Sequence, residues 1–159
     1  MKKLLTAAAL SLSILASTSV VNVPLIGPST AEAAITTGDR LVGNAEWYYG
    51  KVTYVYGSRD IARLRLDCSS FTQLVYKNLG ISIPWGSKAQ ASKGYYVSRS
   101  KLRKGDLVFF RTHGSSIDHV AIYQGNGRII HNLPNRGIVS SNLNDSYWSS
   151  RYVTARHVR

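Results

Sequence analysis

The sequence predicts an α+β fold in which helices come first and an antiparallel sheet follows. Two observations support this class. Between residues 39 and 79, apolar residues recur at helical spacing in two runs, which Gly50 and Gly80 end. From residue 107 onward, short runs rich in β-branched and aromatic residues are separated by polar or glycine-rich turns, which is typical of antiparallel strands.

The first helix is expected to begin at Asp39 and to end at Gly50, after a short disordered lead over residues 34–38. Residues 52–56 then predict a short extended segment, followed by a turn at 57–60. A second helix over about 68–79 and one or two helical turns within 88–92 complete the helical part. The strands of the sheet are expected at 107–110, 119–124, 128–131, 137–140 and 152–156.

The first 33 residues predict a secretory signal. Lys2 and Lys3 precede an apolar run, and Ala31-Glu32-Ala33 supplies the small residues that a signal peptidase reads, so we expect cleavage after Ala33. The alternative is a membrane anchor, but the run is shorter than the ~20 apolar residues that a bilayer requires. We therefore expect no stable membrane anchor. Residues 34–159 would form one domain, and we expect a monomer.

The chain is strongly basic, with 20 Lys and Arg against 8 Asp and Glu and a net charge of +12. Outside a cell, this balance favours contact with anionic wall polymers or lipid surfaces. No nucleic-acid-binding motif occurs, so we expect no nucleic-acid partner. The alternative is that the surplus charge only keeps the domain soluble. A single cysteine also rules out an intrachain disulfide.

That cysteine, Cys68, falls on the expected first turn of the second helix, because Asp67 before it is a preferred N-cap residue. Exposed backbone N–H groups and the positive end of the helix dipole should lower the pKa of its thiol. The alternative is a small buried hydrophobic residue, which is what most free cysteines are. A lone cysteine in a secreted chain favours a working thiol.

A cysteine nucleophile needs a nearby base and a third group that orients the base. Four histidines are available, and two of them, His119 and His131, lie on adjacent expected strands. The other two occupy a loop and the C-terminal tail. No zinc-ligand pattern is present, so we expect no metal or other cofactor.

The turn at 125–127 decides whether the two histidines share a face. In a three-residue loop, Gln124 would face Arg128 and Ala121 would face His131, so that His119 and His131 would be diagonal neighbours. A two-residue turn would shift the register and place them on opposite faces.

Several motifs follow one another in a familiar order. They are Tyr54-Val55-Tyr56-Gly57, Leu66-Asp67-Cys68-Ser69-Ser70-Phe71, Ile83-Pro84 with Ser87 and Gln90, Lys104-Gly105-Asp106-Leu107-Val108-Phe109-Phe110, His119-Val120-Ala121-Ile122-Tyr123 with Gly125-Asn126-Gly127 and His131, and Tyr147-Trp148 with Ala155-Arg156. This series resembles the NlpC-type peptidoglycan endopeptidases, papain-like cysteine peptidases of bacterial cell walls, across most of residues 34–159.

The resemblance implies a secreted, papain-like cysteine endopeptidase in which Cys68 attacks, His119 is the base and His131 orients His119. It also implies that the Tyr54 hydroxyl assists the oxyanion site. The substrate implied is the stem peptide of peptidoglycan, cut between D-γ-glutamate and a diamino acid, typically meso-diaminopimelate. The expected location is the cell envelope, either the extracellular wall or the periplasm.

This sequence departs from the family pattern at Trp85, where arginine is common, and at Ser58, Ala121 and Asn132. The loop from residue 54 to 68 is also basic and somewhat long. Two kinds of alternative function stay open. The same scaffold could serve an N-acetylmuramoyl-L-alanine amidase or an acyltransferase, and the high positive charge would suit a non-catalytic wall-binding module.

Overall fold

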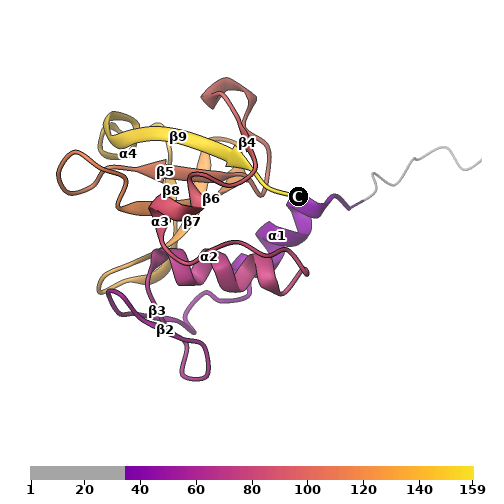
Figure 1. Ribbon diagram of the computed structural model, residues 1–159, viewed down its shortest axis with the longest axis vertical. Coiled ribbons are helices and arrows are strands. Elements are labelled where there is room, and N and C mark those ends of the chain that lie inside the picture. Colours follow the sequence, from indigo (N-terminus) through magenta and orange to yellow (C-terminus); the bar gives the residue numbers. More distant parts are fainter. Residues whose placement is uncertain (1–34) are drawn as a thin grey trace, which may run out of the picture. The chain divides into compact units, whose positions relative to one another are not determined.

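The computed structural model describes residues 35–159, and the expected secretory signal at 1–33 lies outside these residues. The described chain runs through α1 (Thr37–Glu46), β1 (Thr53–Tyr54), β2 (Arg59–Asp60), β3 (Arg65–Leu66), α2 (Cys68–Lys77), α3 (Ser87–Gln90), β4 (Tyr95–Tyr96), a 3₁₀ turn (Arg99–Lys101), β5 (Leu107–Phe110), β6 (His119–Gly125), β7 (Arg128–Leu133), β8 (Gly137–Asn142), α4 (Ser146–Arg151) and β9 (Tyr152–His157). Figure 1 shows their arrangement.

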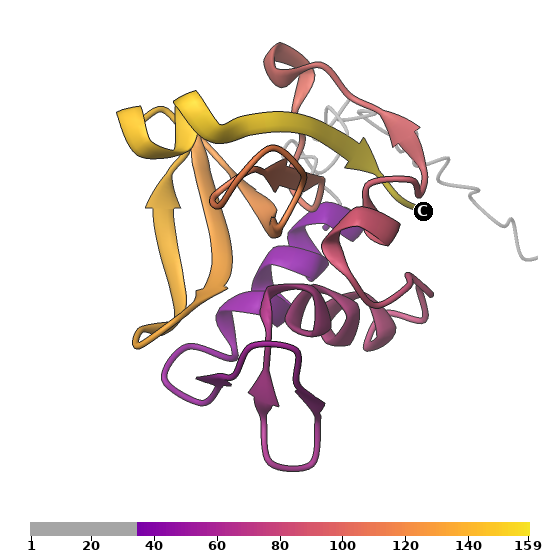
Figure 2. The ribbon, with the colours of Figure 1, turned by 60° about the vertical axis from the view of Figure 1, so that its left-hand side comes forward.

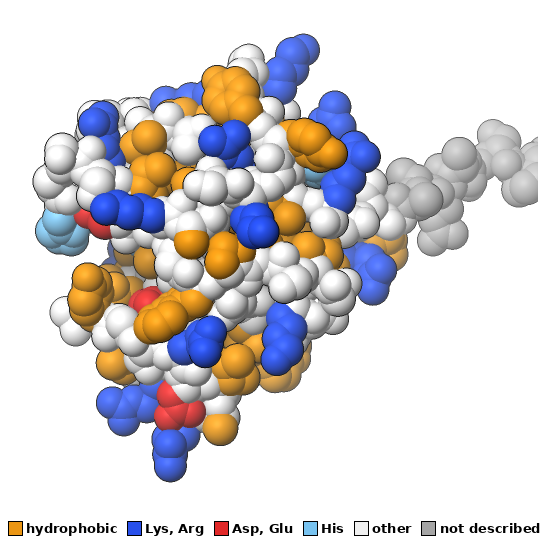
Figure 3. Space-filling view, in the orientation of Figure 1, with side chains coloured by type: hydrophobic (Ala, Val, Ile, Leu, Met, Phe, Trp, Pro, Cys, Tyr) orange, Lys and Arg blue, Asp and Glu red, His pale blue; other side chains and the backbone are white. Residues whose placement is uncertain are grey.

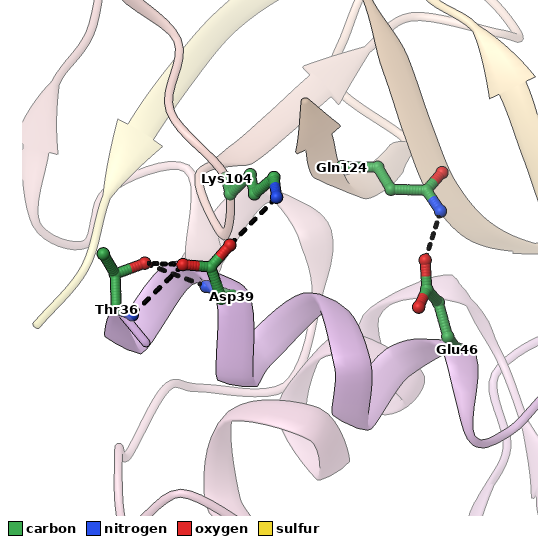
Figure 4. Close-up of polar contacts among 5 residues, drawn as sticks. All are labelled: Thr36, Asp39, Glu46, Lys104 and Gln124. Carbon is green, nitrogen blue, oxygen red and sulfur yellow. Dashed lines mark hydrogen bonds and ion pairs between the residues drawn. The ribbon is translucent and has the colours of Figure 1, made fainter. Parts of the chain in front are cut away.

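Helix α1 begins earlier than expected. Thr36 is its N-cap: the Thr36 side chain accepts from the Asp39 N–H at 3.1 Å, and the Asp39 carboxylate accepts from the Thr36 N–H at 3.1 Å. This capping box satisfies free N–H groups of the first turn, so residues 36–38 are ordered rather than part of a disordered lead. Figure 4 shows two further anchors, from Lys104 to Asp39 at 2.9 Å and from Gln124 to Glu46 at 2.6 Å.

Helix α2 confirms the expected start at Cys68. The Asp67 side chain accepts from the Ser70 N–H at 2.7 Å, and the Ser70 hydroxyl accepts from the Asp67 N–H at 2.8 Å. The helix ends at Lys77, two residues before the expected end, and Gly80 follows with the left-handed φ of 76° that a glycine stop requires. Most of α2 is buried, so its first turn is held firmly against the sheet.

A six-stranded antiparallel sheet confirms the α+β class. Its strand order is β4-β9-β5-β6-β7-β8. Figures 1 and 2 show α1 and α2 side by side against the sheet. One apolar cluster fills the space between them, and a second cluster that includes Trp148 of α4 covers other strand residues. Neither β4 nor α4 was expected from the sequence.

A small sheet with strand order β1-β3-β2 precedes α2. Strand β1 falls in the segment expected to be extended, whereas β2 and β3 were not expected. The N–H of the Asn132 amide donates to the Leu66 carbonyl at 2.7 Å, which fixes the end of β3 directly before Cys68. No helix within residues 35–159 is long and apolar enough to span a membrane.

The β6–β7 turn differs from the expected three-residue loop. Gly125 pairs with Arg128, so the turn holds only Asn126 and Gly127, both with positive φ. The predicted pairing of Gln124 with Arg128 is therefore wrong. A β-bulge between Tyr123 and Gly125 adds one residue to β6, and Ile122 pairs with Ile130. The bulge compensates for the shorter turn, so the two histidines do share a face.

Candidate active site

Cys68 lies at the floor of a cleft where the start of α2 meets the start of β6. Its side chain is 6% exposed, and its Sγ lies 3.9 Å from the Asp118 carbonyl oxygen. The thiol therefore contacts the backbone directly before His119. The surrounding space, hereafter the Cys68 cleft, has a volume of about 490 Å³ and is lined by Tyr54, Asp67, Trp85, Lys88 and Asp118, among others.

Two histidines and a serine form a hydrogen-bonded row beside the thiol. Nε2 of His119 lies 2.8 Å from Nδ1 of His131, and Nε2 of His131 lies 2.9 Å from the Ser141 hydroxyl. Both rings are buried. The Trp148 ring packs against them, with centroid distances of 5.4 Å to His119 and 4.6 Å to His131. The row therefore fixes the orientation of His119.

Sequence reasoning missed Ser141. It lies on β8, which pairs with β7 so that His131 faces Val139. Residues two apart on a strand share a face, so Ser141 lies on the side of the sheet that carries His131. The register of β7 and β8 across the turn at 134–136 was the signal that could have identified it.

Burial controls the charge state of these groups. It raises the pKa of the Cys68 thiol to about 12, although N–H donors at Val120 and Ser69 act in the opposite direction. Burial also lowers the pKa of His119 to about 4. The pKa of His131 lies well below its usual value, because of burial and the nearby His119. Contrary to the sequence expectation of a lowered thiol pKa, the resting site holds a neutral thiol and neutral imidazoles.

Tyr54 reaches the same cleft from β1. Partial burial, with a smaller effect from the nearby Cys68, raises the pKa of its hydroxyl to about 12. The hydroxyl therefore keeps its proton at neutral pH and can donate a hydrogen bond. This placement agrees with the expectation that Tyr54 stands near the thiol.

The Asp67 carboxylate accepts three hydrogen bonds from neighbouring residues. Its carboxylate accepts from the Ser70 N–H, from the Ser69 hydroxyl at 2.9 Å and from the Trp85 indole N–H at 3.1 Å. Trp85 is 43% exposed and forms a wall of the cleft, with the Arg59 guanidinium 5.3 Å from its ring centroid. The tryptophan that departs from the family pattern is therefore joined to the residue before the thiol.

Gln90 supports the wall from behind. Its buried amide donates to the Ser69 carbonyl at 2.8 Å and to the Pro84 carbonyl at 2.9 Å, and it accepts from the Thr72 hydroxyl at 2.8 Å. These three bonds tie α2 to the segment that carries Trp85.

The two remaining histidines are not part of the hydrogen-bonded row. His113 is exposed, with its Nδ1 3.6 Å from the Asp118 carboxylate, and His157 binds the buried Asp106 at 2.6 Å where β5 begins. Within residues 35–159, no group of three or more His, Cys, Asp or Glu side chains is placed to hold a metal ion.

The chain is similar to proteins of one family. The model of the NlpC/P60 family matches residues 50–157. The peptidoglycan DL-endopeptidase CwlO of Bacillus licheniformis is 36% identical over 126 residues, which are 76% of this chain and 26% of that protein. The murein DD-endopeptidase MepS/murein LD-carboxypeptidase of Escherichia coli is 43% identical over 94 residues, 58% of this chain and 50% of that protein. The chain thus spans a quarter to a half of the length of these relatives.

Solved structures show the same fold. An NlpC/P60 family protein from Bacillus cereus superposes with a TM-score of 0.70 and 32% identity, over 77% of this chain and 40% of that one. The NlpC/p60 domain of the peptidoglycan hydrolase SagA superposes with a TM-score of 0.64 and 31% identity, over 77% of this chain and all of that domain.

Proposed function

Because the chain belongs to the NlpC/P60 family, we propose that residues 34–159 form a cysteine endopeptidase that hydrolyses stem peptides of peptidoglycan. The observation that carries this proposal is the contact of the Cys68 thiol with the backbone carbonyl directly before His119, whose ring is hydrogen-bonded to His131. Residues 1–33 would be the secretory signal that directs the enzyme to the cell envelope, where the basic surface also suits anionic wall polymers.

The hydrogen-bonded row supports one direction of proton transfer. If His119 carries its proton on Nε2, it donates to Nδ1 of His131, and His131 donates from Nε2 to Ser141. This arrangement leaves Nδ1 of His119 free to accept a proton from the thiol. His131 and Ser141 act by holding His119 in this tautomer.

Catalysis would proceed by acyl transfer. As the sulfur of Cys68 attacks the peptide carbonyl carbon, His119 takes the thiol proton and then gives it to the departing amine, which leaves a thioester. Water then attacks the thioester and releases the acid. Backbone N–H groups at the start of α2 and the Tyr54 hydroxyl would stabilise the tetrahedral oxyanion.

The neutral resting state fits this sequence of steps. A buried thiol with a raised pKa keeps its proton until substrate fills the cleft, so the proton leaves the sulfur as the new bond forms. Negative charge then develops on the carbonyl oxygen, next to N–H and O–H donors. The buried sulfur therefore does not carry an unpaired charge while the cleft is empty.

The bond that we propose is D-γ-glutamyl–meso-diaminopimelate. The name of the Bacillus licheniformis relative, a peptidoglycan DL-endopeptidase, supports this choice, whereas the Escherichia coli relative is named for other murein bonds. Residues 34–159 and a Cys68→Ala variant should be incubated with purified diaminopimelate-type peptidoglycan, and the muropeptides read by mass spectrometry.

Release of fragments that begin with diaminopimelate, by the parent domain alone, would establish both the bond and the need for Cys68. Cleavage next to muramic acid would instead indicate an amidase. Sedimentation with the wall without cleavage would indicate the binding module that the charge of +12 also suits.

A further inference from the structure

A second hollow lies on the other side of the cleft wall. It has a volume of about 620 Å³, and we call it the α2 hollow because Gln73 and Lys77 of that helix line it, together with Arg59, Ile61, Ile81 and Ser82. Arg59 stacks over Trp85, which lines the Cys68 cleft. The Arg59–Trp85 pair is therefore a shared partition between the two spaces.

Helix geometry places the α2 hollow within reach of a bound peptide. Gln73 and Lys77 follow Cys68 by five and nine residues, which correspond to roughly 8 and 14 Å along the helix axis. An extended peptide covers about 3.4 Å per residue. A peptide that leaves the cleft over the Arg59–Trp85 pair would reach the hollow within roughly three to five residues.

The hollow carries positive charge without acidic partners. Within residues 35–159, neither Arg59 nor Lys77 forms an ion pair, and both are exposed. The neighbouring carboxylate of Asp60 is bound to Arg63 at 3.1 Å. Figure 3 shows lysine and arginine side chains next to hydrophobic ones on the lower half of the visible face, around α2 and β2. Two free cations favour a ligand with carboxylate groups.

The remaining lining suits a peptide. Ile61, Ile81 and Leu74 provide aliphatic surface. Gln73 uses its amide N–H on the Ile83 carbonyl at 2.8 Å, which leaves its amide oxygen as an acceptor. Within the described chain, the exposed Ser82 has no hydrogen-bond partner for its backbone N–H or carbonyl. The hollow thus combines cations, aliphatic surface and groups that can pair with a peptide backbone.

We propose that the α2 hollow is an accessory subsite that binds the distal, carboxylate-bearing part of a cross-linked stem peptide while the bond to be cut lies in the Cys68 cleft. The proposal rests on the proposed function. By this estimate, a peptide with about three residues beyond the bond reaches only Gln73, whereas a cross-linked peptide is long enough to reach Lys77 as well. The enzyme should therefore act faster on cross-linked peptidoglycan than on uncross-linked peptides.

The test compares purified dimeric and monomeric muropeptides of the diaminopimelate type as substrates. Lys77→Glu replaces a cation of the hollow, and Lys93→Glu makes the same change at an exposed lysine that lines neither space. For Lys77→Glu, we expect kcat/KM on the dimer to fall about 3- to 10-fold, because the variant loses a surface ion pair with the ligand carboxylate and adds a repulsive charge. On the monomer, kcat/KM should change less than about 2-fold. For Lys93→Glu, both values should stay within about 2-fold.

An equal fall on both substrates, or no fall on the dimer, would overturn the subsite. Because Lys77 lies in the last turn of α2, Lys77→Gln is measured alongside, and thermal unfolding identifies any variant that has lost its fold. If the parent cuts neither muropeptide, the proposed function fails instead. The subsite is then still tested by calorimetry in the Cys68→Ala background, where equal dissociation constants for dimer and monomer would contradict it.

Discussion

Replacing Ser141 by alanine tests the hydrogen-bonded row without touching substrate. The change removes the hydroxyl that lies 2.9 Å from Nε2 of His131 and leaves that buried nitrogen without its partner. A hydrogen-bonding group left unpaired in a protein interior costs about 1–3 kcal/mol. His131 can lower this cost by moving its proton to Nδ1, the atom that faces His119, because Nε2 is then an unpaired acceptor rather than an unpaired N–H.

That tautomer change would reverse the row. Nδ1 of His131 would become a donor, Nε2 of His119 would have to accept, and Nδ1 of His119 would then carry a proton and could no longer take one from Cys68. A shift of about 1.4 kcal/mol in the tautomer equilibrium corresponds to a tenfold change. We therefore expect kcat to fall about 10-fold while KM stays within about 2-fold.

Ser140→Ala is the matched control. Ser140 precedes Ser141 on the same strand but points to the opposite face, where it contacts Gln124 and Arg128. Steady-state kinetics on a soluble muropeptide, with thermal unfolding of each variant, separates the two serines. A Ser141→Ala enzyme with the kcat of the parent, or one that loses no more activity than Ser140→Ala, would refute the role of the row.

Three further predictions concern the charge states of His119 and Cys68 and the support that Gln90 gives to the Trp85 wall. The pKa of His119 is about 4 in the folded chain but about 6.5 in the unfolded chain, so the unfolded chain binds an extra proton between these values. The free energy of unfolding should therefore fall by up to about 3 kcal/mol as the pH drops from 6.5 to 4. Urea titration at each pH measures it. Alkylation of Cys68 by iodoacetamide should be slow at pH 7 and still rising above pH 9, because the thiol pKa is about 12. Gln90→Ala removes three buried hydrogen bonds and should lower the unfolding free energy by about 2–4 kcal/mol and raise KM, as the Trp85 wall loosens.

Each of these three predictions has an outcome that would contradict it. An unfolding free energy that does not change between pH 6.5 and 4 would place His119 outside the buried site. A fast alkylation rate that is independent of pH above 6 would show a preformed thiolate. A Gln90→Ala domain with the stability and KM of the parent would show that the wall does not depend on this amide.

The sequence alone identified the parts of the site that local chemistry determines. Asp67 as a helix cap located Cys68, and strand alternation brought His119 and His131 together. The three-residue turn predicted between β6 and β7 was wrong, because a β-bulge has no clear sequence signal. The bulge nevertheless restores the register that the longer turn would have given.

Other features depend on tertiary contacts or on weaker signals. The start of α1 was missed because its capping box has Asp39 at the third helical position, where the usual sequence signature has Glu or Gln. Helix α4, a single serine-rich stretch, has no apolar repeat. The thiol pKa could not be predicted from the helix start, because burial by the rest of the chain outweighs the dipole.

Intact mass spectrometry of the domain during turnover can detect the acyl intermediate that the proposed mechanism requires. Residues 34–159 are mixed with a diaminopimelate-type muropeptide, quenched in acid within milliseconds to seconds, and digested for peptide mapping. We expect a transient mass increase equal to the acyl part of the substrate, attached through a thioester to Cys68 and absent from Cys68→Ala. Turnover without any covalent adduct would contradict the proposed mechanism, and so would turnover by Cys68→Ala.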